Sequence, residues 1–241
     1  MIAATMTDAA IRSRLALALD FDDSVVALRW AARLKDYFGV AKVGLELFSA
    51  SGPSVVAGLV GDGFEVFIDL KLADIPNTTR RAARVLGSLG ASYLTVHASA
   101  GTGTLRAGVE GFAEGAESAG FPVPVTLAVT VLTSDPDASP ELLRARVRTA
   151  CEAGCGGVVC AAPDLAEVNA AGPGLLKVVP GIRLAGSAAH DQSRTATPGE
   201  AMRAGAGILV IGRAVTDAPD PVSAAEAIVD ELSAAVPAGG A

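Results

Sequence analysis

Eight short apolar runs, nearly continuous in hydrophobic residues, alternate along the chain with amphipathic stretches rich in Ala, Arg and Glu. The runs are Leu15–Asp20, Val40–Gly44, Glu65–Leu70, Ser92–His97, Val123–Thr130, Gly157–Cys160, Leu175–Pro180 and Gly207–Ile211. Runs that lack a strict apolar and polar alternation are typical of parallel strands buried on both faces. The stretches between them show helical spacing, as in Val25, Leu28, Ala32 and Leu34, or Ala82, Val85, Leu86 and Leu89.

This alternation predicts an α/β fold, a TIM-type (β/α)8 barrel. Eight βα units in 241 residues fit the usual size of such a barrel. We expect residues 1–241 to form a single domain with short flexible termini, because Gly and Pro turns are spread evenly and no linker stands out. The alternative is an open, doubly wound sheet.

Composition narrows the class of protein. A net charge of -7 argues against a nucleic-acid or anionic-membrane surface, although a local basic site remains possible. We find no signal peptide at the N-terminus and no apolar stretch near the ~20 residues that a transmembrane helix needs. The three cysteines are clustered and odd in number, so we expect free thiols and a cytoplasmic protein.

Polar residues stand where the predicted strands end, which is where barrels of this class carry their chemistry. They are Asp20, Lys42, Asp69 with Lys71, His97, Thr130 with Thr133, Arg183 and Arg213. Lysine is scarce, yet two of the four lysines lie at or next to strand ends. We interpret His97 as a structural histidine and the cysteines as buried thiols rather than metal ligands.

The strongest local signal is the segment Phe67-Ile-Asp-Leu-Lys-Leu-Ala-Asp-Ile-Pro-Asn-Thr78. Asp69 and Lys71 are two residues apart on an extended strand end, so their side chains should point to the same side. A charged pair among apolar neighbours is costly unless it is paired or functional. The alternative is a structural ion pair at the barrel rim.

A second signal lies near the end of the chain. Pro180-Gly-Ile-Arg183 and Ile211-Gly-Arg213 follow the seventh and eighth strands, where this fold usually binds phosphate. Gly212 allows close backbone approach, and the Arg213 guanidinium can fork onto phosphate oxygens. These features predict a phosphate site.

The motifs together resemble those of the orotidine 5′-phosphate decarboxylase family, whose members make UMP. The matching segments are Ala18–Asp20, Lys42–Gly44, Asp69–Thr78, Val131–Ser134, Pro180–Arg183, Asp191-Gln192, Thr197-Pro198 and Gly212-Arg213. They span nearly the whole chain in the family's order. Ala214-Val215 departs from the Pro-Ile common at that place.

The resemblance implies a cytoplasmic enzyme that decarboxylates orotidine 5′-phosphate without a metal or organic cofactor. Lys71 would donate a proton to C6 of the pyrimidine, and Asp69 would sit beside the substrate carboxylate. Lys42 and Asp74 would complete an alternating charge network, Asp74 coming from the partner subunit of a homodimer with shared sites.

The resemblance also implies a set of substrate-binding residues. Asp20, Lys42 and the partner's Thr78 would hold ribose hydroxyls, and Thr133 would face the pyrimidine. Gln192 and Arg213 would hold the phosphate, with Gly212 at the same turn and Arg183 in the adjoining loop. The loop from Leu184 to His190 would close over the phosphate.

Two rival functions remain open at this point. One is a magnesium-dependent sugar-phosphate decarboxylase or aldolase-type relative that shares the Asp-x-Lys-x-x-Asp block. Such a relative should carry a carboxylate at the end of the second strand, where this chain has Lys42. The other is a nucleotide-binding barrel that has lost catalysis, against which the intact charged set argues.

Overall fold

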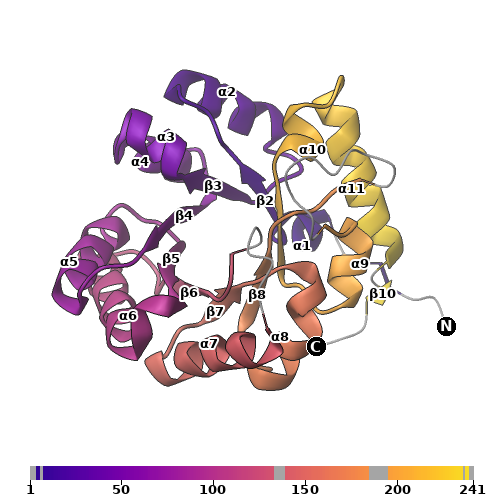
Figure 1. Cartoon of the computed structure of the whole chain (residues 1–241). Helices are drawn as coiled ribbons and strands as arrows, with labels where there is room; N and C mark the ends of the chain where they lie inside the picture. The colour runs from indigo at the N-terminus through magenta and orange to yellow at the C-terminus, as the bar shows by residue number, and fades with distance from the viewer. Residues whose placement is uncertain (1–3, 6–7, 133–138, 185–194, 236, 239–241) are drawn as a thin grey trace.

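In a computed structural model of the chain, eight parallel strands close into a barrel (Figure 1). The structure describes residues 4–5, 8–132, 139–184, 195–235 and 237–238. The barrel strands are β2 (Leu15–Ala18), β3 (Val40–Gly44), β4 (Glu65–Leu72), β5 (Tyr93–His97), β6 (Val125–Val129), β7 (Gly157–Val159), β8 (Leu176–Val179) and β9 (Ile208–Ile211). Pairing of β2 with β9 closes the barrel, so the predicted TIM-type fold is confirmed and the open sheet is wrong.

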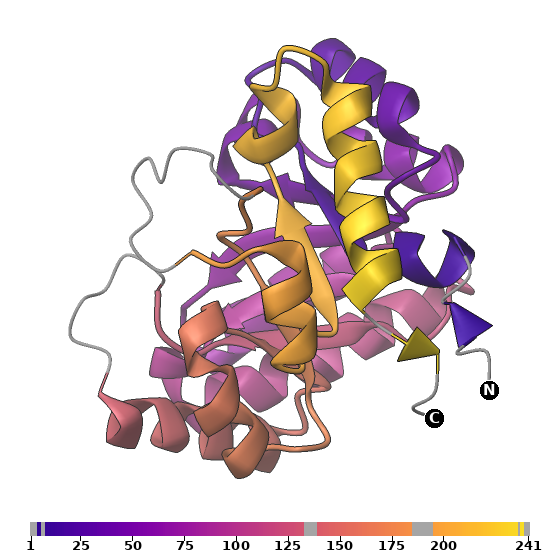
Figure 2. The same cartoon turned by 90° about the vertical axis from the view of Figure 1, so that its right-hand side faces the viewer.

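Helices surround the strands on the outside (Figure 1). They are α2 (Ser24–Leu34), α3 (Leu45–Ser51), α4 (Ser54–Gly61), α5 (Pro76–Gly87), α6 (Gly101–Ser118), α7 (Pro140–Ala153), α8 (Leu165–Ala171), α9 (Pro198–Arg203), α10 (Arg213–Thr216) and α11 (Pro221–Ala235). Short 3-10 turns, η1 (Ala98–Ala100) and η2 (Ala162–Asp164), follow β5 and β7. Helix α11 packs beside α9 and α1 (Asp8–Arg12), and strands β1 (Ala4–Thr5) and β10 (Pro237–Ala238) pair nearby (Figure 2).

Local sequence explains where several helices begin. The Asp23 carboxylate accepts hydrogen bonds from the Val25 and Val26 amides at the start of α2. Thr197 and Glu200 form a reciprocal capping box at the start of α9. Such caps satisfy amides that have no partner within the helix.

The core forms two apolar layers, as expected of strands buried on both faces. Phe67 belongs to the cluster inside the barrel, whereas its neighbours Val66 and Ile68 belong to the cluster between strands and helices. Inside the barrel the layer is built mainly from small and branched residues, consistent with the scarcity of aromatics.

The predicted helix faces were partly wrong. Val25 is 54% exposed and Val85 is 53% exposed, while Ala27 and Ala31 are fully buried in α2. Alanine allows a helix to lie close to the barrel, so the buried face of α2 follows side-chain size as much as hydrophobicity.

Candidate active site

A cavity of about 220 Å³ opens at the carboxyl ends of the strands. Its lining joins residues that lie far apart in the sequence: Ala18, Asp20, Lys42, Phe67, Asp69, Lys71, Val129, Val131, Leu132, Val159, Pro180, Gly181, Arg183, Val210, Gly212 and Arg213. Among the residues that the structure describes, the lining carries four cationic side chains against two carboxylates. In a chain of net charge -7, this local excess of positive charge favours an anionic ligand.

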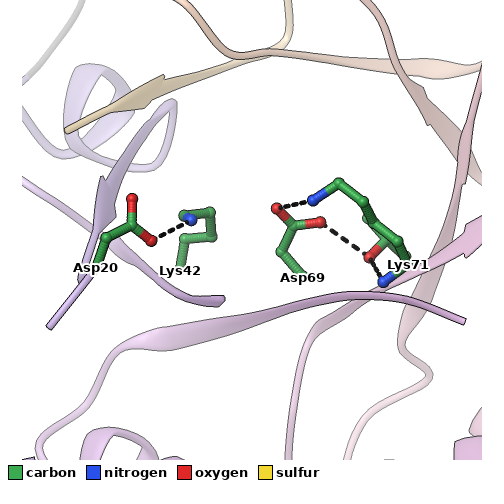
Figure 3. A network of polar contacts seen from close by, with 5 residues as sticks. Asp20, Lys42, Asp69 and Lys71 are labelled. Carbon is green, nitrogen blue, oxygen red and sulfur yellow. Dashed lines mark hydrogen bonds and ion pairs between the residues drawn. The ribbon is translucent and has the colours of Figure 1, made fainter. Parts of the chain in front are cut away.

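Two ion pairs lie in a row across one wall of the cavity (Figure 3). The Lys42 ammonium donates to Asp20 Oδ1 at 2.7 Å, and the Lys71 ammonium donates to Asp69 Oδ2 at 2.8 Å. Asp20 lies in the loop after β2, Lys42 lies on β3, and Asp69 and Lys71 lie on β4, so neighbouring strand ends supply alternating charges. The structure brings Asp20, Lys42, Asp69 and Lys71 together at the barrel mouth, and their catalytic and binding roles stay predictions.

The Asp20–Lys42 ion pair depends on the burial of Lys42 and on the space that Gly44 leaves beside it. The Lys42 side chain is only 10% exposed, so its charge needs the nearby carboxylate. Gly44, at the end of β3, leaves room for it. A Cβ atom there would lie 3.1 Å from both Asp20 Oδ1 and Lys42 Nζ, a tight contact that glycine avoids.

The second pair depends on an irregular strand end. Lys71 has a φ of 50°, and the pairing of β4 with β5 shifts register between Ile68 and Leu72. Simple strand alternation therefore does not explain why the two side chains meet. The Thr95 hydroxyl, from β5, donates to Asp69 Oδ1 at 3.0 Å and accepts from the Lys71 amide at 2.9 Å.

Two arginines line the cavity next to β8 and β9. The Arg183 side chain is buried, and its Nη1 donates to the Ile182 carbonyl at 2.9 Å. Gly181 precedes it with a φ of 80°, a left-handed conformation that glycine adopts without steric cost. Arg213 begins α10 directly after Gly212. The structure brings Arg183, Gly212 and Arg213 to one cavity, and their role in binding phosphate stays a prediction.

Other predicted site residues lie elsewhere. Thr133 and Gln192, and residues 185–190 of the expected closing loop, lie outside the described residues. Asp74 and Thr78 are exposed and do not line the cavity of their own chain. Thr130 donates to the Val159 carbonyl and is not among the lining residues.

His97, also at a strand end, does not line the cavity. Its Nδ1 lies 2.7 Å from the Ser99 hydroxyl. Burial lowers the pKa of His97, and the positive charges of Arg146 and Lys71 lower it further. The neutral ring is therefore favoured.

Sequence reasoning missed Thr95 and most of the apolar wall. Val129, Val131, Leu132 and Val159 line the cavity, a surface suited to a flat, weakly polar ring. Thr95 carried one signal: it is the polar residue two positions before His97 in an otherwise apolar strand.

The charges at the barrel mouth do not suit a metal ion. Within the described ranges, no three His, Cys, Asp or Glu side chains gather in a group able to hold a metal ion. At the mouth itself the carboxylates of Asp20 and Asp69 each face a lysine ammonium, which would repel a cation.

No helix in the described part of the chain has the length and apolarity to cross a membrane.

Comparison with known proteins gives a consistent result. The model of the orotidine 5′-phosphate decarboxylase / HUMPS family matches residues 13–228. The orotidine 5′-phosphate decarboxylase of Anaeromyxobacter dehalogenans is 48% identical over 230 residues, covering 91% of this chain and 98% of the relative. That of Cutibacterium acnes is 43% identical over 237 residues, covering 92% and 97%. The crystal structure of orotidine 5′-phosphate decarboxylase from Lactobacillus acidophilus superposes with a TM-score of 0.78 at 33% identity, covering 90% and 98%.

Proposed function

The chain belongs to the orotidine 5′-phosphate decarboxylase / HUMPS family and decarboxylates orotidine 5′-phosphate to UMP and CO2; we propose that it does so with fixed charges, Lys71 delivering the proton. The observation that carries this mechanism is the row of two ion pairs inside a cavity that also holds two arginines. The positive charges of Arg183 and Arg213 suit the phosphate of the nucleotide. The Asp69–Lys71 pair suits the other end of the nucleotide, the pyrimidine from which CO2 leaves.

The chemical step needs only the substrate and one proton from solvent. The bond between C6 and the carboxylate breaks, its electron pair stays on C6, and CO2 leaves. C6 then takes a proton from the Lys71 ammonium, and the resulting amine regains a proton from water. Because the ring delocalises this charge poorly, stabilisation must be electrostatic.

Positioning has to supply much of the catalysis. An ammonium about 4 Å from the developing carbanion contributes on the order of 4 kcal/mol at an effective dielectric near 20. Extreme enzymes reach ~23 kcal/mol, so the remainder must come from orientation and from binding energy at the remote phosphate. Asp69, held by Lys71 and Thr95, keeps the ammonium aimed into the cavity.

The ribose and the base occupy the space between these ends in this proposal. Asp20 and Lys42 bind ribose hydroxyls, and the pyrimidine lies against the valine-rich wall. Lys42 is the better fixed of the two, because its side chain is 10% exposed against 55% for Asp20. We assign Thr133 to the pyrimidine and Gln192 to the phosphate from the family resemblance alone.

A homodimer with shared sites is part of the proposal. The Asp74 carboxylate accepts a hydrogen bond from the Ile75 amide at 2.6 Å, and the backbone carbonyl of Asp74 accepts from the Thr79 and Thr104 hydroxyls. These bonds hold the loop away from the cavity of the same chain. Ile75 beside it is 66% exposed, and Leu45, after β3, is 58% exposed. These exposed apolar side chains and the exposed Asp74 carboxylate suit contact with a second copy of the chain, to whose site Asp74 and Thr78 contribute.

Subunit mixing tests this sharing. We expect Asp74→Ala and Lys71→Ala proteins to be inactive alone and to regain activity when mixed, because each heterodimer of the two variants carries one intact site. A mixture that stays inactive while dimers exchange would contradict the shared site.

The activity itself is tested by adding orotidine 5′-phosphate and following ultraviolet absorbance, with chromatography to identify UMP. We expect turnover that persists in EDTA. Turnover abolished by EDTA and restored by magnesium would favour a metal-dependent sugar-phosphate relative. Binding without any spectral change would indicate an inactive nucleotide-binding barrel.

The free cysteines also suit a reducing cytoplasm, which we propose as the compartment.

A further inference from the structure

We infer that Thr95 is a positioning residue for proton transfer, because one buried hydroxyl joins the carboxylate of Asp69 to the backbone of Lys71. The inference rests on the proposed function and adds to it a residue that does not touch the reacting atoms. Thr95 is fully buried on β5 and is not among the residues that line the cavity.

The hydroxyl uses both of its hydrogen-bonding capacities. Its proton goes to Asp69 Oδ1 at 3.0 Å, and its oxygen accepts the Lys71 amide at 2.9 Å. Valine has nearly the same shape but can do neither. Serine can do both.

The backbone around Lys71 shows why such a partner is needed. Ile68 pairs with Leu94 and Leu72 pairs with Val96, so three residues of β4 lie opposite the single residue Thr95. This bulge takes the partly buried Lys71 amide out of the regular ladder, so the amide needs another acceptor. The Thr95 side chain supplies it.

The conformation of Lys71 is also unusual. Among the described residues it is the one non-glycine with a positive φ, 50°. A residue with a long side chain holds this conformation only where its surroundings impose it, and such residues cluster at functional sites. Return of Lys71 to an ordinary extended conformation would swing its side chain out of its present direction.

The carboxylate of Asp69 is fixed from two sides. Oδ2 accepts from the Lys71 ammonium at 2.8 Å, while Oδ1 accepts from Thr95. Loss of the Thr95 hydroxyl would let the Asp69 carboxylate rotate, and it would also leave the Lys71 backbone amide without its acceptor. Both ends of the ion pair would lose their fixed orientation through one substitution.

The test compares Thr95→Val with Thr95→Ser. We expect Thr95→Val to lower kcat about 10- to 100-fold, the cost of a hydrogen bond to a charged group and of a misplaced proton donor. KM and the affinity for UMP should stay unchanged, because the ribose and phosphate contacts are intact. Thr95→Ser should recover most of the lost kcat. A purely structural role would not divide kcat from KM in this way.

Thr126→Val is the matched control. Thr126 is 3% exposed on the next strand, β6, and pairs in register with Leu94, which faces the helices rather than the cavity. It loses the same buried hydroxyl group without touching the ion pair, so its kcat should equal that of the unmodified protein.

Three outcomes would overturn the inference. They are a Thr95→Val protein with unchanged kcat, a folded Thr95→Ser protein as slow as Thr95→Val, or a crystal structure of Thr95→Val in which Lys71 keeps its positive φ and its contact with Asp69. The crystal structure needs no turnover, so it tests Thr95 even if the unmodified protein fails to act on orotidine 5′-phosphate. That failure would instead refute the proposed function.

Discussion

Replacement of Lys71 by alanine removes the proton donor and the positive charge at the reacting end. The charge is worth on the order of 4 kcal/mol, or roughly 10³-fold in rate, at about 4 Å from the carbanion. Loss of general acid catalysis costs a further 10²- to 10⁴-fold, roughly. We therefore expect kcat to fall by at least about 10⁵-fold.

The same substitution should change binding selectively. Lys71 Nζ lies 2.8 Å from Asp69, so Lys71→Ala leaves that carboxylate without its cation. Orotidine 5′-phosphate carries a carboxylate to this place and UMP does not. We expect the variant to bind UMP normally and orotidine 5′-phosphate more weakly, and the double variant Lys71→Ala/Asp69→Ala to recover binding of the substrate but not turnover.

The assay is stopped-time quantification of UMP together with calorimetric binding of both nucleotides. Lys35→Ala is the control, because Lys35 is exposed and lies outside the cavity. A Lys71→Ala protein that retains kcat within about tenfold of the unmodified protein would show that Lys71 supplies neither the stabilising charge nor the proton.

Three further predictions concern stability and reactivity. Gly111→Ala should lower the free energy of unfolding by about 1–3 kcal/mol in a denaturant titration, because its Cβ would clash with the backbone carbonyl of Arg80 on α5. Gly61→Ala meets open space and should not destabilise the protein, and equal effects of the two substitutions would contradict this packing. Burial, with a smaller contribution from Cys151, raises the pKa of the Cys155 thiol to about 12. Iodoacetamide at pH 8 should therefore label the exposed Cys151 and spare Cys155, which mass spectrometry of the labelled native protein measures. Burial, and to a smaller extent nearby positive charges, lower the pKa of His97. The unfolded state therefore binds more protons than the folded state, and the stability of the protein should fall as the pH drops from 7 to 5. Thermal melts of His97→Gln should show a smaller loss of stability over this range, and an equal loss would exclude this linkage.

The barrel was predictable because its strands are buried on both faces. Each apolar run became a strand with ends shifted by no more than a few residues, as where the expected Glu65–Leu70 extends to Leu72. Helix faces were harder. Val25 is more hydrophobic than Ala27, yet Ala27 is the buried residue, because close helix packing on the barrel selects small side chains.

The charged part of the site was also predictable, since strand ends of one barrel meet at one mouth. Thr95 was not, because its contacts with Asp69 and Lys71 depend on a register shift that no spacing rule reveals. The roles of Thr133 and Gln192, and the single-domain boundary at 1–241, stay predictions.

The proposed mechanism requires the Lys71 ammonium to lie where CO2 departs. A crystal structure of the protein with UMP measures this directly. We expect the phosphate at Arg213 and Gly212 and C6 within about 3–3.5 Å of Lys71 Nζ. A nucleotide with its phosphate away from these residues, or with C6 turned from Lys71 toward the valine-rich wall, would contradict it.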